Sequence, residues 1–100
     1  MATVGFIEDK DGWWIAKDPN ATKDYELDFG DWLKDGDALA TADWTVPAPL
    51  EQVNQGLTAT LAFVTIGGGV IGQTYEIVAH ITTANGLIDD KSFRLVIRES

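Results

Sequence analysis

Hydrophobic residues recur at every second position in three segments of the chain, which is the spacing of a β-strand with one buried face. Residues 25–29 alternate apolar and acidic side chains, and residues 75–81 and 93–98 follow the same period. The positions that this pattern predicts to point inward are Tyr25, Leu27 and Phe29, then Tyr75, Ile77, Ala79 and Ile81, then Phe93, Leu95 and Ile97.

Shorter apolar runs predict further strands between strong turn signals. Residues 13–16 precede Asp18-Pro19-Asn20, and residues 44–46 end at Pro47-Ala48-Pro49. Residues 56–65 are rich in β-forming residues and are closed by three glycines at 67–69. Asn85-Gly86 predicts a tight hairpin turn between two strands. Residues 31–37 have room for one helical turn that Gly36 would end.

Six or seven short strands in 100 residues predict an all-β fold, an immunoglobulin-like antiparallel β-sandwich of about seven short strands. Tyr75 follows a glycine-containing turn at the start of a strand, as in a tyrosine corner, although an ordinary core tyrosine fits equally well. Sheet-to-sheet packing must replace a disulfide, and the residues expected to provide it are Trp44, Leu61 or Phe63, Tyr75, Ile77, Phe93 and Leu95. We predict an N-terminal arm at residues 1–15, which is a candidate docking segment, and a single domain at residues 16–100.

Composition and charge narrow the classes of function. Hydrophobic residues make up 45% of the chain, as in ordinary globular domains, and a chain of this length buries roughly 65% of its unfolded surface. The net charge of −9 disfavours binding to nucleic acid or to an anionic membrane. No apolar run approaches the ~20 residues of a membrane helix, and the first residues lack the layout of a secretory signal. The acidity serves solubility or forms a face that meets a basic partner.

Candidate catalytic and metal-binding residues are few. The chain has no cysteine, and a serine-type triad would need His80, Ser92 and Asp89 or Asp90, with no glycine turn for an oxyanion hole beside Ser92. The turns at 9–12 and 35–37 are rich in carboxylates, but Asn20 stands where an EF-hand loop opening at Asp9 needs glutamate. The glycines at 67–72 lack the ending of a phosphate-binding loop. We therefore predict no enzyme activity, no cofactor and no bound metal.

Five apolar residues are candidates for an interface with a partner. Trp13 and Trp14 are adjacent and must face opposite sides of a strand, so that one of them is pushed toward solvent or a partner unless the segment Phe6-Ile7 covers it. Trp32 lies between charged residues and either contacts a partner or caps the sandwich. Val70 and Ile71 lie at the tip of the glycine-rich loop and either bury in a partner or fold back over the open end of the sandwich.

The order of motifs along the chain resembles that of a family of small tailed-bacteriophage virion structural proteins, labelled fibre–tail adaptors or phage proteins of unknown role. The resemblance spans residues 16–99. The segments that carry it are Lys17–Ala21, Asp24–Asp28, Asp31–Leu33, Trp44–Pro47, Gly72–Tyr75, His80–Thr83, Gly86, Asp89–Phe93 and Val96–Glu99. It implies an immunoglobulin-like component of the virion near the neck or tail, with no catalytic residue and no cofactor.

The leading hypothesis is a non-enzymatic adaptor that links the tail to fibres or to the head–tail connector. The alternatives are a capsid decoration protein and a carbohydrate-binding module. The expected partners are other virion proteins, met by repeated copies of the chain in a symmetric ring or lattice, and neither nucleic acid nor a membrane. The expected location is the phage particle, after synthesis in the host cytoplasm.

Overall fold

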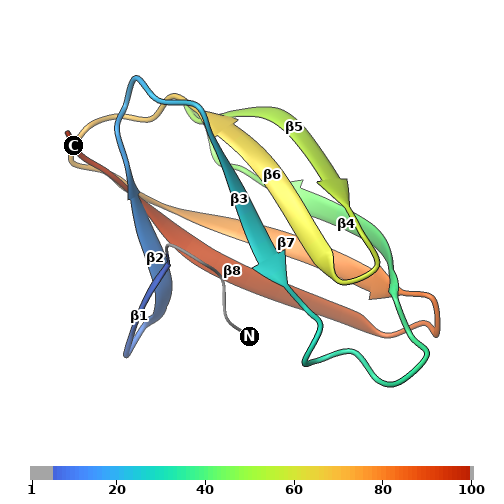
Figure 1. The fold of residues 1–100 in the computed structure, drawn as a ribbon. Helices are drawn as coiled ribbons and strands as arrows, with labels where there is room; N and C mark the ends of the chain where they lie inside the picture. The colour runs from blue at the N-terminus through green and yellow to red at the C-terminus, as the bar shows by residue number, and fades with distance from the viewer. Residues whose placement is uncertain (1–5, 100) are drawn as a thin grey trace.

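Two β-sheets pack face to face in the computed structural model, which describes residues 6–99 (Figure 1). The larger sheet has the strand order β1-β2-β8-β7-β4, and the smaller one has the order β3-β6-β5. The strands are β1 (Ile7–Asp9), β2 (Gly12–Lys17), β3 (Lys23–Asp28), β4 (Leu39–Thr45), β5 (Glu51–Leu57), β6 (Leu61–Gly67), β7 (Thr74–Thr83) and β8 (Ile88–Ile97). The predicted all-β sandwich is confirmed, with eight strands. Residues 6–99 contain no helix that is long and apolar enough to cross a membrane.

One strand pair departs from the predicted antiparallel arrangement. β2 runs parallel to β8, with Trp14 opposite Arg94 and Lys17 opposite Ile97. A tight hairpin forces its two strands to be antiparallel, but β2 and β8 are far apart in sequence and the chain passes into the other sheet after β2. The boundary expected between residues 15 and 16 lies inside β2, and residues 1–5 of the expected arm lie outside the described residues.

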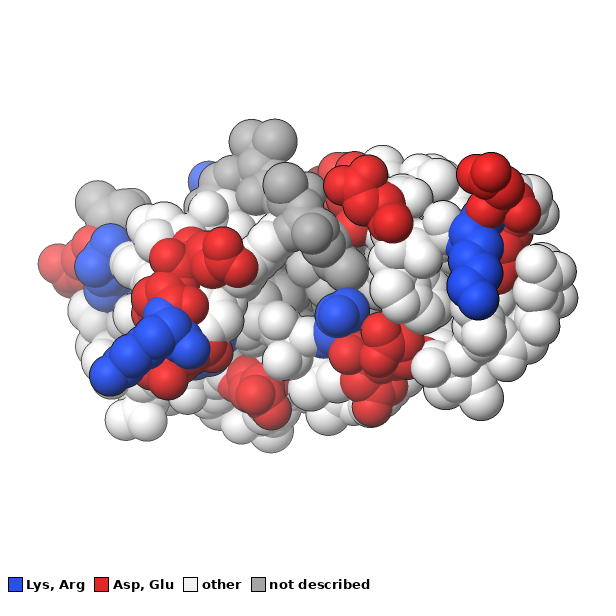
Figure 2. Space-filling view, turned by 90° about the horizontal axis from the view of Figure 1, so that it is seen from below, with Lys and Arg blue, Asp and Glu red and all other residues white. Residues whose placement is uncertain are grey.

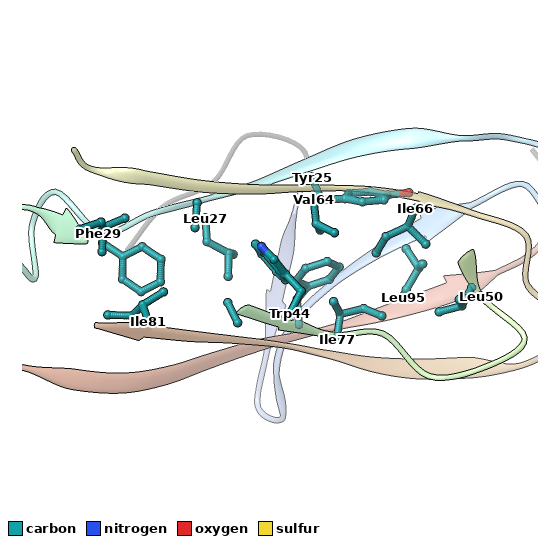
Figure 3. Packing of buried hydrophobic residues seen from close by; sticks show 14 of the residues in the cluster. Tyr25, Leu27, Phe29, Trp44, Leu50, Val64, Ile66, Ile77, Ile81 and Leu95 are labelled. Atoms are coloured by element: carbon teal, nitrogen blue, oxygen red, sulfur yellow. The ribbon is translucent and has the colours of Figure 1, made fainter. Parts of the chain in front are cut away.

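The core lies between the two sheets and is formed mainly by the side chains that the period-two pattern places inward (Figure 3). Nine of the ten predicted inward residues are buried; Tyr75 is only partly buried. Trp44 joins them from β4, as expected. The alternation therefore specified the buried face of β3, β7 and β8 correctly.

The prediction for β6 was wrong, because this strand is apolar on both faces. Its buried residues are Ala62, Val64 and Ile66, whereas Leu61 and Phe63 are only partly buried. Phe63 pairs with the exposed Glu26 on the outer face, and its ring lies against Gly56 of β5, where a Cβ atom would be 2.3 Å from the ring. Because Leu61 and Phe63 on the outer face are as apolar as the inward residues, the pattern does not reveal which face is buried.

The predicted turns are largely confirmed. Gly86 has a φ of 89° in the turn that joins β7 to β8, and its N–H donates to the Thr83 carbonyl. The segment predicted as one strand over 56–65 is divided by a turn at 58–60, where Leu61 N–H donates to Thr58 Oγ at 3.0 Å. Residues 31–37 form successive turns instead of a helix, with one helix-type hydrogen bond from Leu33 N–H to the Phe29 carbonyl.

Candidate functional site

The glycine-rich connection from β6 to β7 ends in a tight turn over residues 70–73. Gln73 N–H donates to the Val70 carbonyl, and the turn is tied to the end of β8 by bonds from Gly72 N–H to the Ile97 carbonyl and from Ile97 N–H to the Gln73 carbonyl. Val70 N–H also donates to the Tyr75 hydroxyl at 3.2 Å. Tyr75 thus bonds back to the preceding backbone, as predicted for a tyrosine corner.

A buried lysine holds the other side of this connection. Lys17 lies at the end of β2, and its Nζ donates to the Gly68 carbonyl at 2.6 Å and to the Asp18 carbonyl at 2.8 Å. Burial lowers the pKa of Lys17 because it disfavours the charged ammonium. The loop is therefore anchored to β2, β7 and β8.

Val70 and Ile71 project from this anchored turn. They are 49% and 51% exposed, so of the two alternatives they do not fold back over the open end of the sandwich. The hydrogen bonds to Ile97 and Tyr75 hold the turn at the end of the sheets, which leaves the two side chains half in solvent. An apolar pair on a rigid turn is a suitable contact point for a partner.

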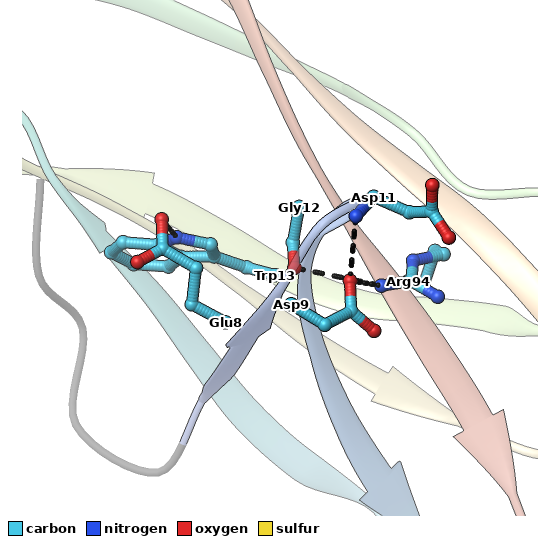
Figure 4. Close-up of polar contacts among 6 residues, drawn as sticks. All are labelled: Glu8, Asp9, Asp11, Gly12, Trp13 and Arg94. Carbon is cyan, nitrogen blue, oxygen red and sulfur yellow. Dashed lines mark hydrogen bonds and ion pairs between the residues drawn. The ribbon is translucent and has the colours of Figure 1, made fainter.

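The two adjacent tryptophans of β2 face opposite sides, as predicted. Trp13 points to the inner side, where its ring centroid lies 6.2 Å from that of Phe6, and its Nε1–H donates to Glu8 Oε2 at 2.7 Å (Figure 4). Trp14 lies on the outer face of the larger sheet, with the Arg98 guanidinium 5.6 Å from its ring centroid. Phe6 therefore covers part of Trp13, and neither indole is fully buried.

Trp32 lies at the other end of the sandwich from Val70 and Ile71, in the connection between β3 and β4 (Figure 1). Its ring packs edge-on against Phe29, with the centroids 6.1 Å apart. Trp32 thus contributes to the cap of the core at that end. The five candidate residues do not form one site: they lie at two ends and on two faces of the domain.

A groove opens beside Trp13 between the two sheets. It has a volume of about 300 Å³ and is lined by Glu8, Gly12, Trp13, Leu27, Lys91 and Ser92. Next to it, the Asp9 carboxylate accepts hydrogen bonds from Arg94 at 2.6 Å and from Asp11 N–H at 2.9 Å (Figure 4). The hydrogen bond from Arg94 lowers the pKa of Asp9. This contact fastens the β1–β2 hairpin to β8.

The acidic turns named as calcium candidates use their carboxylates within the fold. Asp9 binds Arg94, and Asp37 Oδ1 accepts from the N–H groups of Ala38 and Asn85. Within residues 6–99 no three potential metal ligands come together. Figure 2 shows acidic side chains at several separate places on the face in view, with basic side chains beside some of them.

His80 lies on the outer face of the larger sheet, between Asp90 and Thr45. Its Nδ1 is 2.8 Å from Asp90 Oδ1, and its Nε2 is 2.9 Å from Thr45 Oγ. The hydroxyl partner is thus Thr45 of β4 and not Ser92. The His80 and Asp90 side chains are 44% and 59% exposed, so this row is open to solvent.

Three apolar residues are the most exposed of those that sequence reasoning did not single out as contacts. Ile88 is 76% exposed, Val53 is 59% exposed and Ile7 is 51% exposed. Counting back by twos from Phe93 places Ile88 on the outer face, so a signal for it existed in the sequence. Val53 stands alone among polar residues at a register shift between Gln52 and Asn54, and no periodicity marks it.

A comparison with known protein families finds one family whose model matches most of the chain. The model of the family described as "Podophage GP4 fiber-tail adaptor protein gp77" matches residues 17–96, which is four fifths of the chain. The matched region extends from the last residue of β2 almost to the end of β8. Among curated proteins, none matches the chain.

Proposed function

The chain belongs to the family of podophage GP4 fiber-tail adaptor proteins, and on that premise we propose that it is a non-enzymatic structural protein of the phage particle that links the tail to fibres or to the head–tail connector. The family match over residues 17–96 carries this proposal. Its partners are then other virion proteins, and its place is the neck or tail, in repeated copies around a symmetric ring.

The anchored turn supports a docking role. Val70 and Ile71 are half-exposed apolar side chains on a backbone that Tyr75 and the end of β8 hold in place. A rigid apolar contact loses little conformational freedom on binding, and repetition around a ring strengthens a weak contact. Trp13, Trp14 and Trp32 are further candidate contacts, since each indole is partly exposed.

The copy number of the chain in gradient-purified particles, measured by quantitative mass spectrometry, tests the function. We expect about six or about twelve copies, the number that a ring around the tail axis provides. Hundreds of copies would instead indicate a shell decoration. Absence of the chain from the particles would overturn the proposal.

Incorporation of surface variants tests the docking turn. We expect Val70→Asp combined with Ile71→Asp to remain folded but to be lost from purified particles, because carboxylates would have to be buried at the contact. Val53→Asp is the matched control, since Val53 is comparably exposed but lies on β5, away from the turn. Equal incorporation of the two variants would contradict a role for the turn.

A further inference from the structure

We propose that the groove beside Trp13 binds an arginine side chain presented by the partner protein. The inference rests on the proposed function, since it names the chemistry of one contact that an adaptor would make. It is carried by the groove walls: an indole, an aliphatic side chain and a carboxylate lie around about 300 Å³ of space. This is the room and the chemistry that a long cationic side chain needs.

The groove is preorganised on its aromatic side. Trp13 lines it, and the bond from Nε1–H to Glu8 Oε2 fixes the indole and the carboxylate relative to each other (Figure 4). Glu8 Oε1 stays available as an acceptor, since the described contacts of Glu8 use Oε2. Gly12 has a φ of 110° and no atom within 4 Å of where its Cβ would be, so the groove mouth is open at this point.

The electrostatics favour a cation. Glu8 and Lys91 line the groove with one negative and one positive charge, and Asp89, which lies outside the lining, pairs with Lys91. Lys91 Nζ lies 3.8 Å from Asp89 Oδ2, so its own charge is partly compensated. The chain as a whole carries −9, and this field attracts basic partners.

Among cations, arginine fits these walls best. Its planar guanidinium can stack on an indole and donate to a carboxylate at the same time, while its aliphatic stem packs on apolar surface. A lysine ammonium is a compact, strongly hydrated charge and lacks the flat face for stacking. Tryptophan and arginine are also the residues most enriched where interfaces gain their binding energy.

The test is an NMR titration of the full chain with N-acetyl-arginine amide, read from the four tryptophan indole signals. The Trp13 signal is identified with a Trp13→Phe variant. We expect this signal to shift saturably while those of Trp14, Trp32 and Trp44 stay in place, and we expect N-acetyl-citrulline amide, which is neutral, to cause no shift. An equal response to citrulline or no response at all would each overturn the proposal.

A charge-matched pair of variants completes the experiment. Glu8→Gln keeps an acceptor for the Trp13 indole but removes the charge, and we expect about a 5- to 10-fold weaker arginine response because a charge-assisted hydrogen bond is lost. Glu26→Gln removes the same charge from β3 outside the groove and should bind as the unmodified chain does. Equal affinities of the two variants would refute the role of Glu8. Failure of arginine binding with normal copy number in particles would reject the groove alone, whereas absence from particles would reject the adaptor function.

Discussion

Two glycines of the connection between β6 and β7 provide a matched test of how firmly that connection is held. Gly69 and Gly72 both have positive φ, at 104° and 87°. A Cβ at position 69 would lie 2.8 Å from Ile97 Cδ1 and Cγ1 and 3.1 Å from Leu50 Cδ2, whereas a Cβ at position 72 would have no atom within 4 Å. Alanine at either site meets a strained backbone, but only at position 69 does it also meet a packed core.

The expected losses of stability follow from these contacts. A left-handed conformation costs a non-glycine residue roughly 1–2 kcal/mol, and we expect Gly72→Ala to lose about that much. Overpacking a filled core adds roughly 1–3 kcal/mol, and Ile97 is fully buried and cannot move aside into solvent. Gly69→Ala should therefore lose about 2–5 kcal/mol. The lower entropy of the unfolded chain after a glycine-to-alanine change is common to both variants and cancels in their difference.

Urea unfolding followed by tryptophan fluorescence measures both free energies. We expect Gly69→Ala to be less stable than Gly72→Ala by about 1–3 kcal/mol, with the same dependence on urea. For a domain of this size, each kcal/mol also lowers the melting temperature by roughly 4–8 °C. Equal losses in the two variants would refute the reasoning, because they would show that the loop backbone is not held against Leu50 and Ile97.

Three further predictions concern titratable groups in the core and in the hairpin. Among residues 6–99 the buried Tyr25 hydroxyl has no hydrogen-bond partner. Tyr25→Phe should therefore leave the free energy of unfolding, measured by urea unfolding, unchanged or raise it by about 1 kcal/mol. A clear loss of stability would show that the hydroxyl has a hydrogen-bond partner. Burial raises the pKa of Tyr25 to about 12, above its unfolded value of 10. The stabilisation is therefore fully present below pH 10, and the free energy of unfolding should fall by up to about 3 kcal/mol as the pH rises toward 12. In the Tyr75→Phe variant Tyr25 is the one remaining tyrosine, so the ultraviolet absorbance follows its ionisation alone. The Arg94 hydrogen bond keeps the pKa of Asp9 below 3.8, so the stabilisation of the hairpin should be present above that pH and be lost as the pH falls below it. Amide hydrogen exchange in β1 and β2 should therefore change less with falling pH in Asp9→Asn than in the unmodified chain.

The sequence was sufficient for the fold wherever one face of a strand is apolar and the other polar. In β3 the acidic residues between Tyr25, Leu27 and Phe29 leave only one way to bury the strand. In β6 both faces are apolar, and the burial of Val64 instead of Phe63 is decided by pairing with β3 and by the space above Gly56. β5 was missed because most of its residues are exposed and polar, and its existence depends on hydrogen bonds to β6.

The candidate site shows the same division between local and long-range information. Val70 and Ile71 were identified from the sequence because glycines around an apolar pair predict an exposed loop tip. The groove could not be identified from the sequence, because its walls come from four different strands. These are β1 with Glu8, β2 with Trp13, β3 with Leu27 and β8 with Lys91. The parallel pairing of β2 with β8 brings these side chains together, and no local pattern predicts that pairing.

An adaptor has to contact two proteins at once, and the two docking surfaces proposed here are suited to different partners. The turn with Val70 and Ile71 lies at one end of the sandwich and presents apolar side chains, whereas the groove beside Trp13 lies at its side and presents a carboxylate with an indole. The two surfaces share no residue. If the two surfaces serve separate partners, Val70→Asp combined with Ile71→Asp should abolish the apolar contact and leave the arginine response of Trp13 unchanged. Glu8→Gln should keep the apolar contact and weaken the arginine response by about 5- to 10-fold. A changed arginine response in the turn variant would show that the two surfaces are not independent.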